Sequence, residues 1–118
     1  MTPGRARALV RTRIAEAAPI FAALGDETRL CIVLRLCDAG PQSIVRLTEA
    51  ADVTRQAVTK HLRALSDAGL VRCERVGRET IWELETKRLE EVRRYLDQIS
   101  QRWDGALARL KTLVETER

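Results

Sequence analysis

Apolar side chains recur along most of this chain at the three- and four-residue spacing of amphipathic helices. In residues 4–18 this spacing puts Leu9 and Ile14 on one side of a first predicted helix. Pro19 favours the first turn of a separate short segment that continues to Leu24, because proline has no backbone N–H to donate. We therefore expect two helical pieces at the N-terminal end.

A second helix is predicted from Glu27 to about Asp38, with Asp26 as its N-cap. Its apolar positions surround it almost completely, so we expect a central helix that is packed on several sides. These positions are Leu30, Ile32, Val33, Leu34, Leu36 and Cys37. The segment Ala39-Gly40-Pro41 then ends the helix.

Two further helices are separated by a very short connection. We expect a minimal strand at Ser43-Ile44 and then a helix over about residues 45–51, with Leu47 and Ala50 facing inward. The connection Asp52-Val53-Thr54 follows, and Asp is tolerated in the backbone of a tight turn.

The helix after this connection is predicted from Arg55 to Ala68, with Thr54 as its N-cap and Gly69 at its end. Its apolar positions recur at i, i+4 and i+7, so one side of it faces a core. These positions are Val58, Leu62 and Leu65.

The hydrophobic period then changes from helical to alternating. Residues 70–76 and 79–84 are typical of two strands around Gly77-Arg78, and Thr80, Trp82 and Leu84 share one face of the second strand. This pattern predicts a β-hairpin.

The last stretch, residues 86–116, has the most regular pattern of the chain. Apolar positions alternate between spacings of four and three over roughly four heptads, which is the seam of a coiled coil. The seam consists of Leu89, Val92, Leu96, Ile99, Trp103, Ala106, Leu110 and Leu113. A helix of ~30 residues is ~45 Å long, more than the width of so small a domain, so we expect part of the seam to need a partner.

Composition agrees with one mainly α domain, residues 1–118, that carries a small β-hairpin. The 118 residues are 45% hydrophobic and 32% charged, which favours a globular chain, and only 3% aromatic, which favours helix–helix packing. No run of ~18 uncharged apolar residues exists, so no membrane span is expected. The N-terminal arginines lack the apolar core of a secretory signal. Three cysteines make no disulfide framework, so we expect a reducing, cytoplasmic setting.

The short helix, the three-residue turn and the second helix form a helix-turn-helix, and the hairpin makes it a winged one over residues 43–85. From Thr54 to Ser66 there are three cations and no carboxylate, and the net charge of the chain is +4. A helix that enters the major groove of DNA needs donors near its start and no negative charge. The alternative is a solvated basic helix face.

The outer side of this second helix supplies the candidate DNA contacts. We expect Arg55 and Gln56 to touch base edges, and Thr54 and Thr59 to bond a phosphate or a base. Lys60 and Arg63 are better placed for the DNA backbone, which positions a protein without reading sequence.

The tip of the hairpin adds candidate phosphate contacts. Arg75 and Arg78, and also Arg72 on the first strand, are expected to follow the DNA backbone beside the site. The alternative is that these arginines form salt bridges with neighbouring carboxylates. Those carboxylates are Glu74, Glu79 and Glu83.

Several segments resemble the arsenic-repressor (ArsR/SmtB) family over about residues 15–85. They are Leu24-Gly25-Asp26-Glu27-Thr28-Arg29, Leu47-Thr48-Glu49-Ala50, Thr54-Arg55-Gln56-Ala57-Val58-Thr59-Lys60-His61-Leu62, Leu65, and Ala68-Gly69-Leu70-Val71. The chain departs from the family pattern at Val45, where a capping Ser or Thr is frequent, and at Asp52, where Gly is frequent.

The resemblance implies a homodimeric winged helix-turn-helix repressor that binds an inverted repeat of double-stranded DNA with one recognition helix per half-site. It also implies that the first and last helices, residues 1–24 and 86–116, form the dimer interface, in agreement with the seam. The expected interface residues are Leu9, Ile14, Leu89, Val92, Leu96, Ile99, Trp103 and Leu110.

The signal that such a protein would sense is open. The stretch before the recognition helix has no thiol, and the C-terminal helix has no histidine, so the chain is similar to the subset of the family without metal sites. We expect no metal and no cofactor. The only histidine, His61, is expected to be structural. A small-molecule effector is not identified by any motif.

The thiols allow a second kind of response. Cys31 and Cys73 are candidate redox-active thiols, and an arsenite site shared between protomers stays open, whereas Cys37 is expected in the core. The alternative to a DNA-binding regulator is a protein-interaction module that recruits another chain through its last helix. No catalytic set of residues is evident, so an enzyme is not expected.

Overall fold

The computed structural model describes residues 3–117, apart from the side chains of Pro3, Arg5, Ala6, Leu9, Val10 and Thr12. The described chain is mainly helical with one small antiparallel sheet. Its elements are α1 (Pro3–Leu24), α2 (Glu27–Ala39), β1 (Gln42–Ser43), α3 (Ile44–Ala50), α4 (Arg55–Asp67), β2 (Val71–Val76), β3 (Glu79–Leu84) and α5 (Thr86–Thr116).

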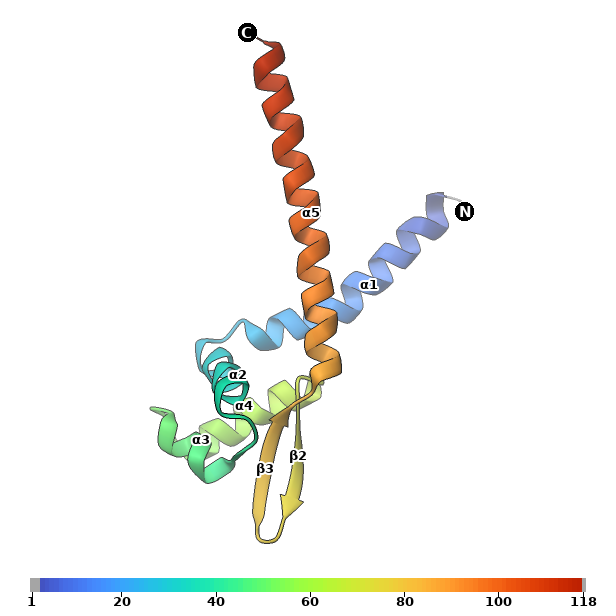
Figure 1. Cartoon of the computed structure of the whole chain (residues 1–118). Helices are drawn as coiled ribbons and strands as arrows, with labels where there is room; N and C mark the ends of the chain where they lie inside the picture. The colour runs from blue at the N-terminus through green and yellow to red at the C-terminus, as the bar shows by residue number, and fades with distance from the viewer. Residues whose placement is uncertain (1–2, 118) are drawn as a thin grey trace.

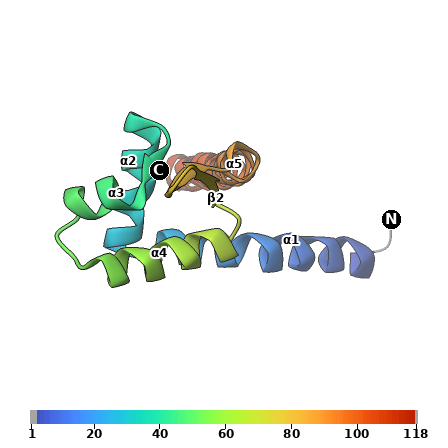
Figure 2. The ribbon, with the colours of Figure 1, turned by 90° about the horizontal axis from the view of Figure 1, so that it is seen from below.

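Most elements are packed together at one end of the molecule, and two helices extend from it (Figure 1). Figure 1 shows α2, α3, α4 and the hairpin gathered at one end, while α5 and the N-terminal half of α1 diverge from them like the arms of a V. Figure 2 looks almost along α5, with α4 lying across the view. Because α5 has 31 residues, it accounts for most of the longest dimension of the chain, 66 Å.

The predicted break at Pro19 is wrong, because α1 is one continuous helix with Pro19 inside it. Ala17, Ile20 and Ala23, on both sides of the proline, are all buried. Packing of this shared face therefore outweighs the loss of one backbone hydrogen bond. Figure 1 shows that α1 changes direction along its length, as expected of a helix that contains proline.

The ends of α2 are as predicted, but one of its apolar sides is exposed. The Asp26 carboxylate accepts a hydrogen bond from the Arg29 backbone N–H at 3.0 Å, and the Gly40 N–H donates to Leu36 at a positive φ of 75°. The helix packs against α1, α4 and β3, as expected of a central helix, but its buried residues are only Ile32, Val33 and Leu36. Leu30, Leu34 and Cys37 are exposed because no other part of the described chain covers that side.

The short strand lies one residue earlier than predicted and has a larger role. Gln42 pairs with Trp82 and Ser43 with Ile81, so β1 becomes the third strand of a sheet in the order β1-β3-β2. Ser43 also caps α3, since its hydroxyl oxygen accepts from the Arg46 N–H at 3.2 Å. The cap expected to be missing at Val45 is thus supplied two residues earlier.

The hairpin and the third helix follow the prediction closely. Strands β2 and β3 pair from Val71 with Leu84 to Val76 with Glu79. Gly77 has a φ of 64° at the first position of the two-residue loop, which is where a tight hairpin turn favours glycine. In α3, Leu47 is buried as expected, whereas Ala50 is exposed.

One hydrophobic core holds together the elements at one end of the molecule. Side chains of α1, α2, α3, α4 and the sheet meet in it, and Leu89 and Val92 of α5 pack against its edge. The buried members are Ile20, Ala23, Ile32, Val33, Leu36, Leu47, Val58, Leu62, Leu65, Leu70, Val71 and Trp82. Across residues 3–117, none of the helices combines the length and apolar character that crossing a membrane requires.

Candidate nucleic-acid interface

The orientation of α4 is fixed by its apolar stripe. Val58, Leu62 and Leu65 are all 0% exposed, which confirms the predicted inner face. The opposite side of the helix must then face solvent, because successive turns of a helix hold the same face outward. At its start, the Thr54 hydroxyl oxygen accepts from the Ala57 N–H at 3.1 Å, so α4 begins at the predicted residue.

The outward face of α4 carries the predicted contact residues. Arg55, Gln56, Lys60 and Arg63 are all exposed. In the part of the chain that is described, no carboxylate lies within salt-bridge distance of the three cations. Their donors are therefore available to an anionic or hydrogen-bonding partner.

The hydroxyl groups of Thr54 and Thr59 already take part in hydrogen bonds with the backbone of α4. Thr54 uses its oxygen as the helix cap but keeps its hydroxyl proton for a partner. The Thr59 hydroxyl donates to the Arg55 carbonyl at 2.9 Å, so it can only accept a further hydrogen bond without breaking that contact.

Arg46 on α3 is a candidate that the sequence reasoning missed. It is exposed on the first helix of the helix-turn-helix, and this helix crosses the DNA backbone in proteins of the class. The signal was present in the sequence as a lone cation on the short helix.

The arginines of the wing differ in whether they form ion pairs with carboxylates of their own chain. Arg72 bonds Glu83 at 2.7 Å and lies 3.7 Å from Glu85, so the salt-bridge alternative holds for it. The hydrogen bond and the negative charge of Glu83 raise the pKa of Arg72. Arg75 and Arg78 are exposed at the far end of the hairpin, and no ion pair involves either of them among residues 3–117.

His61 points away from the outer face and toward the start of α2. Its Nδ1 is buried, has no hydrogen-bond partner and lies 3.8 Å from the Asp26 carboxylate. That carboxylate has a lowered pKa, first because it accepts the Arg29 backbone N–H, and also because of nearby positive charge. A role inside the fold, as predicted for His61, agrees with this position.

All three cysteines are free and exposed, so the expectation of a buried Cys37 is wrong. The reason is that the α2 side that holds Leu34 and Cys37 is uncovered. Cys31 lines a hollow of about 220 Å³ between α2 and α3, and Cys73 lies on β2. Within the described residues, no cluster of three or more His, Cys, Asp or Glu side chains is arranged to hold a metal ion.

The predicted interface residues of α1 and α5 are mostly uncovered. Ile14, Leu96, Ile99, Trp103 and Leu110 range from 48% to 66% exposed. Leu89 and Val92 differ, because they pack on the core of their own chain. The side chain of Leu9 lies outside the described residues.

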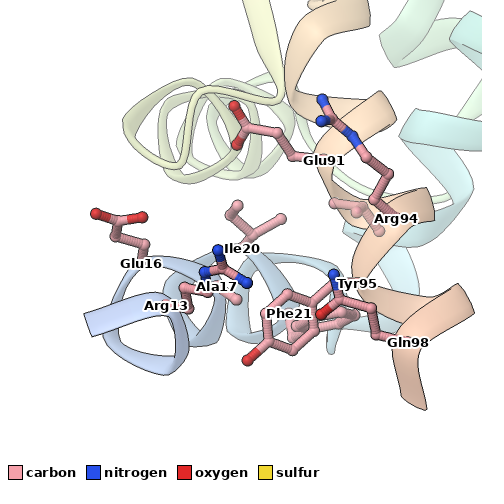
Figure 3. A pocket seen from close by; sticks show the side chains of 10 residues that line it. Arg13, Glu16, Ala17, Ile20, Phe21, Glu91, Arg94, Tyr95 and Gln98 are labelled. Carbon is pink, nitrogen blue, oxygen red and sulfur yellow. The ribbon is translucent and has the colours of Figure 1, made fainter. Parts of the chain in front are cut away.

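The two arms meet where α1 crosses α5. The Phe21 and Tyr95 rings contact edge to face at 5.9 Å, beside a hollow of about 390 Å³ that Figure 3 shows. Beyond this crossing the exposed apolar positions of α5 continue along its length.

A helix-turn-helix with a cationic outer helix and a hairpin beside it defines a winged helix-turn-helix DNA-binding protein. The helix-turn-helix domain family matches residues 24–74. An ArsR-like transcriptional regulator from Rhodococcus sp. RHA1 is 41% identical and superimposes with a TM-score of 0.70, over 84% of this chain and 92% of that one. The chain thus belongs to the ArsR family of transcriptional regulators.

Two other similarities extend the comparison. The arsenical resistance operon repressor of Bacillus subtilis is 38% identical over 64 residues, which are 54% of this chain and 61% of the repressor. A homodimeric winged helix-turn-helix domain from Mycobacterium bovis shares the fold, with a TM-score of 0.62 and 19% identity, over 86% of this chain and 88% of that domain.

Proposed function

We propose that the chain represses transcription as a homodimer that binds an inverted-repeat operator. In each half-site, α4 enters the major groove and Arg75 and Arg78 of the wing contact phosphates. The observation that supports this proposal is the outward face of α4, whose cations form no ion pair among the described residues and which has no carboxylate until Asp67, the last residue of the helix. Repression follows because a dimer that occupies its operator excludes other proteins from the same DNA.

Dimer formation is supported by the exposed apolar seam of α5. Five large apolar side chains of the seam are exposed to solvent in the single chain, which is unusual for a stable monomer. They are Leu96, Ile99, Trp103, Leu110 and Leu113. Two-fold pairing of these seams would bury them and supply two recognition helices. Two such helices suit half-sites whose centres are ~34 Å apart, one turn of DNA. The domain from Mycobacterium bovis, which shares this fold, is homodimeric.

The test is binding of the native chain and of Arg55→Ala/Gln56→Ala to DNA selected from a random pool. Each good base contact contributes ~1–3 kcal/mol, so the double variant should lose about 2–5 kcal/mol of specific binding. Lys111→Ala, at an exposed lysine of α5 that lies neither on the seam nor beside it, also removes one positive charge and is the matched control. Unchanged specific binding by the double variant would refute the assigned contacts.

The backbone contacts have a separate signature. Lys60→Gln and Arg78→Gln should each lower the salt slope of binding by ~1 and leave sequence preference unchanged. A change in the preferred sequence with either variant would contradict their assignment to phosphates.

The exposed seam also favours a second candidate, a module that recruits a different chain. Sedimentation of the purified chain distinguishes the two, since a monomer that binds no DNA at low salt supports recruitment.

A thiol response is a further candidate for the regulated step, favoured by the exposure of Cys31 and Cys73. DNA binding measured before and after hydrogen peroxide or arsenite, with Cys31→Ser and Cys73→Ser, tests it. A response that both serine variants retain would exclude these thiols.

A further inference from the structure

A second cationic surface lies far from α4, in the opening between α1 and α5. It is a cleft of about 480 Å³ just beyond the Phe21–Tyr95 crossing. Three arginines, two amides and one glycine line it, with no carboxylate among them. They are Arg13 of α1 and Gln98, Gln101, Arg102, Gly105 and Arg109 of α5.

The arginines of this cleft have no partner of opposite charge. Arg13, Arg102 and Arg109 are exposed, and over residues 3–117 none of them has a carboxylate within 4.0 Å. Three like charges around one hollow repel each other, and a guanidinium offers donors in a fork that matches carboxylate or phosphate oxygens. An anion in the cleft would reduce the repulsion among the three arginines and accept hydrogen bonds from their guanidinium groups.

Gly105 lies beside the Arg109 guanidinium in this cleft. A side chain at this position would meet the Arg109 Nη1 at 3.5 Å, so the guanidinium folds back over the glycine toward the preceding turn of α5. This brings the Arg109 charge closer to the level of Arg102 than their seven-residue separation alone would.

Of the cleft and the hollow next to it, only the neighbouring hollow is lined by carboxylates. That hollow shares Arg13 and Gln98 with the cleft and adds Arg94, but it also contains Glu16 and Glu91. Figure 3 shows both glutamates at the end of the hollow opposite Gln98. The side toward Arg102 and Arg109 therefore keeps its positive charge.

A second copy of the chain would not neutralise the cleft through the positions that flank its seam. From residue 93 to residue 116 these flanking positions contain no carboxylate. They are Arg93, Tyr95, Ser100, Arg102, Leu107, Arg109, Val114 and Thr116. Seam-to-seam pairing would therefore bring arginines, and no acids, from the flanks of the partner.

We propose that this cleft binds a small, multiply charged anion that carries phosphate or carboxylate groups, held by Arg13, Arg102 and Arg109. The volume lies within the ~300–1,000 Å³ of small-molecule sites. Because Arg13 comes from α1 and the other two from α5, the bound anion ties the two arms of the V together. One chain builds the site, so it does not depend on the proposed DNA binding.

The experiment is calorimetric titration of the full chain, without DNA, with sodium pyrophosphate and separately with sodium citrate at constant ionic strength. The cleft variant is Arg102→Gln/Arg109→Gln. Two controls remove the same charge elsewhere: Arg93→Gln/Lys111→Gln on another side of α5, and Lys60→Gln/Arg63→Gln on α4. All of these side chains are exposed, so the variants should stay folded, which a thermal melt verifies.

We expect saturable binding that weakens at least tenfold in the cleft variant and less than twofold in both controls. Binding of pyrophosphate alone identifies a phosphate ligand, and binding of citrate alone identifies a carboxylate ligand. The proposal is overturned if neither anion binds saturably, if all three variants weaken binding equally, or if only the α4 variant does.

Discussion

Replacing Leu110 by Gln is the cleanest test of the seam, because Leu110 is 56% exposed and lies outside the core of its own chain. The substitution therefore leaves the fold of the single chain intact. Full burial of a leucine contributes ~1.5–3 kcal/mol, so about 1 kcal/mol remains available from the exposed part. A two-fold dimer carries the change twice, which gives a loss of about 2 kcal/mol.

At ~1.4 kcal/mol per factor of ten, this loss raises the dimer dissociation constant about 30-fold. Sedimentation equilibrium over a series of protein concentrations measures that constant directly. Thr112→Gln, two residues further along α5 and off the seam, is the matched control and should leave it unchanged. The same constant for Leu110→Gln and the native chain would refute the assignment of the seam to the dimer.

Three further predictions concern the single chain. Leu62→Ala, at a position that is 0% exposed, should lower the free energy of unfolding by ~2–5 kcal/mol in urea titrations, and a loss below that range would indicate a looser core. Since the pKa of Asp26 is lowered from 3.8, the stability its ionised form contributes is complete above that value and disappears as the pH falls through the folded-state pKa. Asp26→Asn keeps an oxygen that can cap α2 but has no charge at any pH. The native chain and this variant should therefore become more similar in stability only as the pH falls through the folded-state pKa of Asp26. A stability difference that does not change with pH would contradict this. Gly105→Ala should stabilise α5 by ~0.5–1 kcal/mol, because the added Cβ makes an ordinary contact at 3.5 Å, and a lower melting temperature would argue against it.

The helix-turn-helix was predictable because its signals are local. The Thr54 cap, the stripe through Val58 and Leu62, and Gly77 in the turn each act within a few residues of where they stand in sequence. The cationic face of α4 then follows, since a helix with one buried stripe must expose the opposite side. No long-range contact is needed for these inferences.

The features that were mispredicted depend on distant parts of the chain. Pro19 lies within a helix because residues on both sides of it are buried against other elements. Gln42 becomes a strand residue only because Trp82, forty residues away, offers its backbone. Cys37 has the apolar neighbours of a core residue, yet nothing in the described chain packs over it.

The candidate anion cleft could not be predicted from the sequence either, because its charged residues come from distant parts of the chain. Arg13 and Arg109 are far apart in sequence, and each alone is typical of a solvated helix face. Only the crossing of α1 and α5 brings both of them to the same hollow. A sequence pattern within one helix contains no information about that crossing.

One part of α1 links the proposed dimer contacts to the proposed DNA contacts, because it shares a core with the inner side of α4. Ile20 and Ala23 of α1 share a core with Leu62 and Leu65 of α4, whose other side is the recognition face. Protein interiors are close-packed, so a shift of α1 cannot be absorbed within this core without moving α4. The angle at which two copies cross would then set the distance between their recognition helices. If the proposed anion fixes α1 against α5, it acts on the same distance, and its binding would then be coupled to binding of the proposed operator.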